Sequence, residues 1–381
     1  MGDYLEGAKA LAELPYTRSP YSSRAWGNPL HSLCSYQGKL KPSIAHFLVK
    51  LFTQPGDTVL DPFSGSGTIP LEARLQGRIA IANDLQELAY ILSFAKVSPI
   101  DNDVLNERTA EFLEYVTTAT PDPAVLEAAS GFGLNGTLSE YFHPQNLAEI
   151  VNARTYIKQH IHDLDREHAL IFSAFLHILH GNRPYALSRT SHPVTPLKPK
   201  GEFEYREMSS RIVAKLDKSV AAGGLPIELG GDLLDGRAYW GSYEAIPEVG
   251  SVDAVITSPP FAGSTRFHSS NWMRLWAAGW DPEDFRAKKP EFLEEQQKKG
   301  LGVYGEFYDA AHRWLKPGGR LILHLGKTAK IDMRSELQEL AAEKFEYVFG
   351  FDESVEGAEK FGIRDQGATK FHQFLFLRKA A

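Results

Sequence analysis

The segment that decides the fold is GDTVLDPFSGSGTIPLEARLQG, residues 56–77. It runs from a β-branched apolar stretch through small residues into apolar residues at helical spacing, which predicts a strand, a glycine turn and a helix. Gly65 and Gly67 carry no Cβ, so the backbone there can turn sharply and approach a ligand closely. Asp61 ends the strand at the carboxyl edge of a parallel sheet, where open α/β sheets bind ligands. A purely structural strand–helix turn is the alternative interpretation.

Two further predicted strands end in acids. GRIAIAND, residues 77–84, ends in Asp84, one strand–helix unit after the glycines, where an acidic side chain can accept both hydroxyls of a ribose. IELGGDLLDG, residues 227–236, predicts a third strand at which Asp232 is placed to accept the amino group of an adenine. Asp235 fits that spacing equally well, and a cap or turn role is the alternative for each acid.

A second motif, SVDAVITSPPFAGS, occupies residues 251–264. Its apolar run predicts a buried strand, and the two prolines forbid its continuation because neither can donate a ladder hydrogen bond. An amino group on a base is a poor nucleophile, since its lone pair is delocalised into the ring. Two acceptors, Ser258 Oγ and the Pro259 carbonyl, would favour the tetrahedral nitrogen that forms during attack on a methyl sulfonium. Pro260 keeps the loop rigid, and Phe261 would stack on an extruded base.

DPFSGSGT and TSPPF together resemble the motifs of the amino-directed DNA methyltransferases, which use S-adenosylmethionine to methylate cytosine N4 or adenine N6. The resemblance implies an α/β fold with a Rossmann-like class I methyltransferase sheet, mostly parallel with one antiparallel edge strand. In that family a loop that begins with Ser, as Ser258 does here, favours cytosine N4. The implied function is therefore base flipping followed by methylation of cytosine N4 in DNA.

The resemblance extends beyond the two motifs. LHSLCSYQGKLKPSIAHFLVKLF, residues 30–52, is similar to the family's segment that closes over the methionine end of the donor, and residues 314–326 resemble its late helix, Gly-Gly turn and strand. EYVFGFDE and HQFLFLRKA correspond to the last two strands, paired antiparallel. The resemblance implies cofactor contacts from Tyr36, Lys39, Pro42, Asp61, Phe63, Gly65, Ser66, Gly67, Thr68, Asp84 and Asp232. It implies catalytic roles for Ser258, Pro259, Pro260 and Phe261.

The order of the motifs bears on where DNA recognition lies. In many Ser-Pro-Pro enzymes the catalytic loop precedes the glycine turn, whereas here Asp61 comes first, so the order is permuted. Helical patterns at 104–116, 143–161 and 166–181 fill the gap between the motifs. We expect two halves of a catalytic domain, 1–98 and 226–381, around a mainly helical insertion, 99–225. That insertion is the candidate DNA-recognition region; a structural cap is the alternative.

Basic residues refine this assignment. The stretch 183–200 holds four Lys or Arg and no acid, and the stretch 15–56 likewise lacks acids, so both could neutralise a nucleic-acid backbone. Trp272 and Trp276 lie four residues apart, which favours one core-facing helical stripe over stacking on bases. The predicted DNA contacts are Arg183, Arg189, Lys198, Lys200, Arg266 and Arg274. Ordinary solvated surface is the alternative for the basic stretches.

Composition is compatible with such an enzyme. The chain has 381 residues, 43% hydrophobic and 23% charged, with a formal net charge of −7, which argues against a passive nucleic-acid coat protein. Its single cysteine, Cys34, excludes an intramolecular disulfide and a cysteine-based metal site, and we predict no metal. We expect no signal peptide, no membrane span and a cytoplasmic, nucleoid-associated bacterial or archaeal enzyme. The polar segment 282–300 is expected to be an exposed helix or mobile loop.

Several alternatives stay open. An adenine-N6 DNA enzyme would share every motif, and RNA guanine-N2 enzymes have comparable glycine turns. A non-catalytic, cofactor-sensing DNA binder belongs to a different class. The expected partners are DNA and, where a restriction–modification pair exists, a restriction endonuclease acting on the same site. The sequence does not indicate the oligomeric state.

Overall fold

The computed structural model describes residues 2–14, 19–23, 26–97, 99–181, 185–192, 195–220, 236–263, 267–355 and 369–380. Among these residues, seven strands form one sheet in the order β3-β2-β1-β4-β5-β7-β6. Their bounds are β1 (Thr58–Asp61), β2 (Ile79–Asp84), β3 (Arg237–Trp240), β4 (Val252–Thr257), β5 (Leu315–Thr328), β6 (Phe345–Ser354) and β7 (Thr369–Lys379).

The strand directions confirm the fold predicted from the sequence. The pairs formed among β1 to β5 are all parallel, while β7 pairs antiparallel with both β5 and β6. This is the Rossmann-like arrangement of a class I methyltransferase, with the antiparallel strand second from one edge. The carboxyl ends of β1, β2, β3 and β4 therefore meet at one edge of the sheet, where such folds bind ligands.

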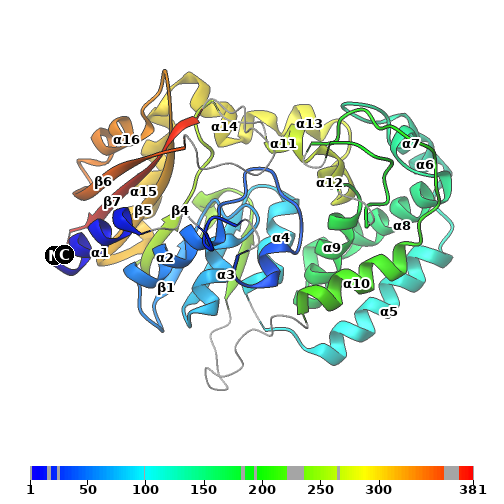
Figure 1. Ribbon diagram of the computed structural model, residues 1–381, viewed down its shortest axis with the longest axis horizontal. Helices are drawn as coiled ribbons and strands as arrows, with labels where there is room; N and C mark the ends of the chain where they lie inside the picture. Colours follow the sequence, from blue (N-terminus) through cyan, green and yellow to red (C-terminus); the bar gives the residue numbers. More distant parts are fainter. Residues whose placement is uncertain are drawn as a thin grey trace.

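Helices cover both faces of this sheet (Figure 1). One face carries α1 (Gly2–Glu13), α2 (Pro42–Phe52), α3 (Thr68–Leu75) and α4 (Glu87–Val97), whose apolar side chains share a core with the strands. The other face carries α15 (Tyr304–Trp314) and α16 (Met333–Ala341), packed through residues such as Phe307 and Leu337. Burial on both faces explains the continuous apolar runs of the central strands.

Between β2 and β3 the chain leaves the sheet and forms helices, drawn at the right of Figure 1. They are α5 (Asn102–Thr118), α6 (Pro123–Gly131), α7 (Leu138–Tyr141), α8 (Pro144–His160), α9 (Arg166–Ile178) and α10 (Met208–Val220). Pro144 begins α8, as its fixed φ favours. These helices share a large apolar core with α4, which fixes them to the sheet. Trp272 and Trp276 are buried in that same core, as the sequence predicts.

The segment between β4 and α15 differs from expectation. It forms α11 (Phe267–Ser270), α12 (Trp272–Ala277), α13 (Asp284–Ala287) and α14 (Leu293–Gln296), joined by short 3₁₀ turns. Residues 282–300 are therefore not one exposed helix, because Phe292, Leu293 and Glu294 are buried. Within the described ranges no helix has the length and apolar character needed to span a bilayer.

Candidate active site

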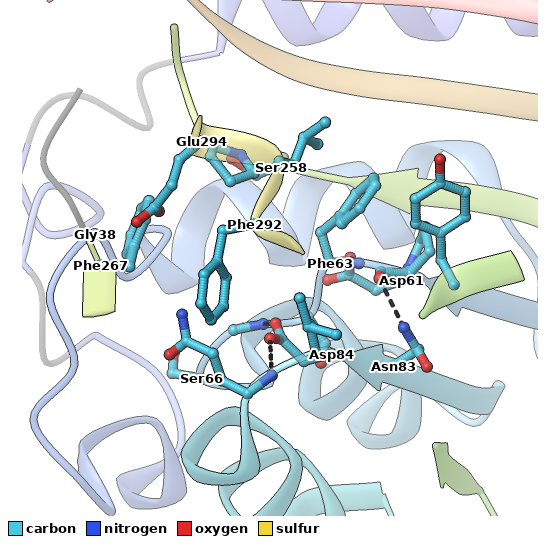
Figure 2. Close-up of a pocket in the computed structure, with 18 of the residues that line it drawn as sticks. Gly38, Asp61, Phe63, Ser66, Asn83, Asp84, Ser258, Phe267, Phe292 and Glu294 are labelled. Atoms are coloured by element: carbon cyan, nitrogen blue, oxygen red, sulfur yellow. Dashed lines mark hydrogen bonds between the residues drawn. The ribbon is translucent and has the colours of Figure 1, made fainter. Parts of the chain in front are cut away.

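A cavity of about 340 Å³ lies at the carboxyl ends of β1 to β4. Its volume falls in the range of small-molecule sites. Figure 2 shows Asp61, Phe63 and Asp84 around one part of it, with Phe292 and Glu294 on the opposite side and Ser258 at its margin. Both sequence motifs therefore meet in the same cavity, since Ser258 and Pro260 line it together with Gly65 and Asp84.

The glycine turn forms the floor of this cavity. Gly65 and Gly67 have φ values of +51° and +70°, which L side chains rarely adopt. A Cβ on Gly67 would lie 2.9 Å from the backbone of Ser93, and a Cβ on Gly65 would contact the Tyr36 ring at 3.5 Å. The buried Lys96 donates a hydrogen bond to the Ser66 carbonyl, and this bond stabilises the turn. Glycine is thus required here for conformation at both positions and for close packing at Gly67.

Asp84 joins the end of β2 to the glycine turn. One carboxylate oxygen accepts from the Gly65 amide at 2.8 Å and the other from the Gln86 amide at 3.0 Å. Burial raises the pKa of this carboxyl to about 6, while the two amide donors lower it. Each oxygen keeps a second lone pair, so the side chain can also accept the hydroxyl groups of a ribose.

Asp61 joins the end of β1 to the end of β4. Its Oδ1 accepts from Thr257 Oγ1 at 2.6 Å and from the Phe63 amide at 3.3 Å. Burial raises the pKa of Asp61 to about 7, against the lowering effect of these donors. A buried carboxyl in this state gains most from a cationic partner, which an ammonium or sulfonium group would supply.

The catalytic loop predicted at Ser258 to Phe261 begins directly after β4. Ser258 Oγ lies 3.0 Å from His324 Nδ1, and the Pro260 carbonyl accepts from Gln297 Nε2 at 3.1 Å. Pro259 is buried beside them. The Phe261 ring packs against Gly326 on β5, where an added Cβ would meet it at 2.5 Å.

The remaining predicted cofactor residues have different environments. Tyr36, Lys39, Phe63, Ser66 and Thr68 line the cavity. The Tyr36 ring stacks on Phe267 with centroids 6.3 Å apart. Pro42 instead lies at the first position of α2, where it is buried among apolar side chains.

Sequence reasoning missed the residues that follow β3. The predicted third strand, with Asp232 and Asp235, lies outside the described residues, and the observed β3 is Arg237–Trp240. Gly241, Ser242, Tyr243 and Glu244 follow it and line the cavity, and Tyr243 packs against Phe63 with ring centroids 5.3 Å apart. The signal that could have located them is the aromatic pair in RAYW before a glycine.

It also missed the wall formed by α14 and its flanks. Phe267, Phe292, Leu293 and Glu294 line the cavity, and Glu294 accepts from His268 Nδ1 at 3.0 Å. The polar composition of 282–300 gives no local signal for this placement.

The predicted DNA contacts fall into three groups. Arg183 and Arg266 lie outside the described residues, and Lys198 and Lys200 are exposed. Arg189 donates to the carbonyls of Gly201 and Glu140 at 2.7 and 3.0 Å.

The prediction for Arg274 is wrong. Its side chain is 1% exposed and donates to the carbonyls of Leu176 and His180 at 3.0 and 2.7 Å. A guanidinium satisfied by buried carbonyls joins α12 to the end of α9, so it cannot reach a phosphate.

A family model matches part of this chain. Residues 31–129 match the family model described as UPF0020, RMKL-like, methyltransferase domain. Comparison with the curated protein sequences finds no match.

Three solved structures illustrate the similarity in fold. TYW2 of Pyrococcus horikoshii in complex with MeSAdo is 10% identical over 88% of this chain and 61% of its own, with a TM-score of 0.31. Geranyl diphosphate C-methyltransferase of Streptomyces coelicolor A3(2), with S-adenosyl-L-homocysteine, is 10% identical over 90% and 77%, with a TM-score of 0.36. The rRNA methyltransferase aviRa of Streptomyces viridochromogenes is 12% identical over 95% and 93%, with a TM-score of 0.34.

The chain spans 61% of the length of TYW2 and 63% of a second matching Pyrococcus horikoshii structure. Structural matches with TM-scores this low give no information about the substrate of this chain. The family match, the sheet order and the cavity define the class: the chain carries an S-adenosylmethionine-dependent methyltransferase domain.

The residues present fit that cofactor. The glycine turn allows close approach, Asp84 offers acceptors to a ribose, and Asp61 offers a carboxylate to an ammonium group. Phe63, Leu85 and Tyr243 also line the cavity and offer apolar surface against which an adenine can pack. When bound, the cofactor supplies an electrophilic methyl group on a sulfonium.

Proposed function

We propose that this chain transfers a methyl group to the exocyclic amino group of a nucleobase, with cytosine N4 in DNA as its substrate. The observation that carries the proposal is the shared cavity. Ser258 and Pro260, from the Ser-Pro-Pro loop, line the same 340 Å³ space as the cofactor residues Asp61, Gly65 and Asp84. An amine held by the loop would therefore face the methyl donor without a rearrangement of the sheet.

The chemistry of the loop supports an amine as acceptor of the methyl group. Ser258 supplies a hydroxyl oxygen, and the prolines place main-chain carbonyls that no ladder hydrogen bond requires. Acceptors aimed at the two N–H bonds favour the tetrahedral nitrogen of the transition state over the planar ground state. A loop fixed between β4 and the Gln297 side chain holds them in place before the reaction starts.

The serine at the head of the loop supports cytosine N4 over adenine N6, because the resembling DNA enzymes that begin this loop with Ser are mostly of the cytosine type. For DNA as the polymer, the support is the pair of exposed lysines, Lys198 and Lys200, on the helical region inserted between β2 and β3. We assign recognition of the target sequence to that region, residues 99–225. Phe261 would stack on the flipped base.

The test uses the purified chain with S-adenosylmethionine labelled in its methyl group. Double-stranded DNA, single-stranded DNA and total RNA are incubated separately, digested to nucleosides and analysed by mass spectrometry. The expected product is N4-methylcytosine in DNA, formed at least about tenfold more slowly by Ser258→Ala while cofactor affinity is retained. N6-methyladenine in DNA would support methylation of an exocyclic amine and show that the target base is adenine, not cytosine. Label in RNA alone would overturn DNA as the substrate, and no label in any polymer would overturn the function.

A further inference from the structure

A chain of hydrogen bonds leads from Ser258 away from the cavity through two histidines. Ser258 Oγ lies 3.0 Å from His324 Nδ1, and His324 Nε2 lies 3.2 Å from His372 Nδ1. The three residues come from the end of β4, from β5 and from β7, which are neighbours in the sheet. The two hydrogen bonds therefore form a continuous chain that crosses three strands.

His324 is enclosed at the middle of this chain. Its side chain is 2% exposed and packs between the rings of Phe261 and Phe374, at centroid distances of 5.4 and 4.9 Å. Burial lowers the pKa of His324 well below its ordinary value, and positive charge on His372 or Lys41 lowers it further. The imidazole is therefore neutral, so one ring nitrogen is a donor and the other an acceptor.

A neutral His324 leaves two orders for the chain. In the first, the Ser258 hydroxyl donates to Nδ1, and Nε2–H donates to His372. In the second, Nδ1–H donates to Ser258, and His372 donates to Nε2. Only in the first order does the Ser258 hydroxyl donate its proton to His324. Both lone pairs of Ser258 Oγ are then free to accept hydrogen bonds from another group. An amine whose N–H bonds must be held requires that first order.

We propose that His324, backed by His372, is a positioning residue that fixes Ser258 Oγ as a hydrogen-bond acceptor toward the reacting amine and takes up the serine proton when Ser258 receives the amine proton. This inference rests on the proposed function, because it assigns a direction to a hydrogen bond that only an amine substrate requires. The proposal thus gives a role in the reaction to His324 on β5, which lies outside the loop Ser258 to Phe261.

The proton path balances without an additional base. Formation of the N–C bond and cleavage of the C–S bond leave the nitrogen positively charged with one N–H proton to lose. That proton passes to Ser258 Oγ as the serine hydroxyl proton passes to His324 Nδ1. The His324 Nε2 proton passes to His372 Nδ1, and the partly exposed His372 releases one proton to water. Both rings end neutral, with their tautomers inverted until protons exchange with solvent.

Three substitutions at one position test the acceptor role. In His324→Phe the ring shape is kept and the acceptor is lost, so kcat should fall about tenfold or more with unchanged cofactor affinity. His324→Asn places an amide oxygen near the position of Nδ1, which keeps the acceptor but takes up no proton, so it should recover only part of that rate. His324→Gln places its amide near Nε2 and should stay as slow as His324→Phe. His312→Phe, a histidine on α15 that packs against Phe345, is the matched control and should leave both values unchanged.

A double-mutant cycle tests whether His324 acts through Ser258. If it does, adding His324→Phe to Ser258→Ala should cost less than about threefold in kcat, since the hydroxyl it positions is already gone. Multiplied losses in the double variant, or wild-type kcat in His324→Phe, would overturn the proposal while leaving the amine methyltransferase function intact.

A second readout needs no turnover. Nitrogen-15 NMR of the full chain labelled at histidine should show His324 with an unprotonated Nδ1 and a protonated Nε2, and the Nδ1 signal should shift in Ser258→Ala. If no polymer is methylated, the proposed function fails, and this tautomer still decides the hydrogen-bond direction. A protonated Nδ1 facing Ser258 would overturn the inference in either case.

Discussion

Thr257 Oγ1 donates a 2.6 Å hydrogen bond to Asp61 Oδ1, across 196 residues of sequence. Thr257 is the last residue of β4 and directly precedes Ser258, whereas Asp61 is the last residue of β1 and begins the glycine turn. The bond therefore joins the two sequence motifs at the base of the cavity. It also lowers the pKa of a carboxyl that burial otherwise raises.

Thr257→Val tests this link. The substitution keeps the β-branched shape and removes the donor, so the pKa of Asp61 should rise further and the carboxylate should be scarcer at neutral pH. We expect cofactor affinity to fall about tenfold at pH 7, the order expected for a hydrogen bond to a charged group. The loss should shrink at pH 9, where Asp61 is ionised in both proteins. Calorimetric titration with S-adenosylhomocysteine gives both values, with Thr58→Val on β1 as control.

The pH dependence of cofactor binding has a defined sign. The pKa of Asp61 is about 7 and that of Asp84 about 6 in the unliganded protein, both raised by burial. A cationic ligand binds the ionised form of Asp61, so lowering the pH below 7 should weaken binding about tenfold per unit from this group alone. In Asp61→Asn affinity should be low and flat over that range. Wild-type affinity that does not change between pH 6 and 8 would contradict the assignment.

The same groups make the unliganded protein less stable at higher pH. Because their folded-state pKa values lie above the unfolded values, the folded chain holds protons that the unfolded chain has released. The stability they contribute is present below about pH 4 and is lost as the pH rises through about 6 for Asp84 and 7 for Asp61. We expect the loss of Tm between pH 5 and 8 to be smaller in Asp61→Asn than in the wild type. Melting curves without cofactor provide the measurement, and parallel pH profiles would exclude this contribution.

Gly67 and Gly250 form a matched pair for the glycine turn. Their φ values are similar, +70° and +62°, but a Cβ on Gly67 would meet the backbone of Ser93 at 2.9 Å, whereas a Cβ on Gly250 would meet nothing within 4 Å. Gly250→Ala should cost only the strain of a left-handed residue, about 1–2 kcal/mol. Gly67→Ala should cost more and should also weaken cofactor binding. Equal unfolding free energies for the two variants would show that packing at Gly67 is unimportant.

The segments that the sequence predicted to meet at the cavity, and that do line it, are those whose conformation is encoded locally. A β-branched run followed by closely spaced glycines allows few conformations, and Ser-Pro-Pro can only end a strand. The residues at 241–244 were missed because β3 is a short strand at the sheet edge, partly exposed, without the apolar run that marks β1 and β4. Glu294 was missed for another reason: its burial depends on α14 packing against the cavity, which no local pattern encodes.

Arg274 is an error of the opposite kind, because the sequence predicted a DNA contact for a residue with a structural role. An arginine beside tryptophans is typical of nucleic-acid contact, yet its surroundings are set by α9, which lies almost one hundred residues earlier in the chain. The carbonyls at the end of that helix need donors, and the guanidinium supplies them. Only the tertiary packing of α9 against α12 distinguishes this structural role from a surface role.

The exposed lysines of the helical region provide a test of DNA binding. If Lys198 and Lys200 contact phosphates, replacing either with Ala should weaken binding to all DNA sequences alike and reduce the slope of log K against log salt by about 0.9. Lys344→Ala, on the opposite side of the fold beside Asp309, should leave the slope unchanged. Fluorescence anisotropy over a salt series measures these slopes. Unchanged slopes in both lysine variants would move the DNA surface away from this region.

Gly326 controls the position of Phe261. A Cβ at this β5 residue would lie 2.5 Å from the Phe261 ring, so Gly326→Ala should displace the ring from the strand. Since Phe261 ends the loop that we propose to hold the amine but is not among the residues that line the cavity, kcat should fall about tenfold or more while the Kd of S-adenosylhomocysteine stays constant. Gly305→Ala, at a position on α15 with no atom within 4 Å of the added Cβ, is the control. A Gly326→Ala variant that loses cofactor affinity in step with kcat would place Phe261 in the cofactor site, so the ring would no longer be available to stack on a base.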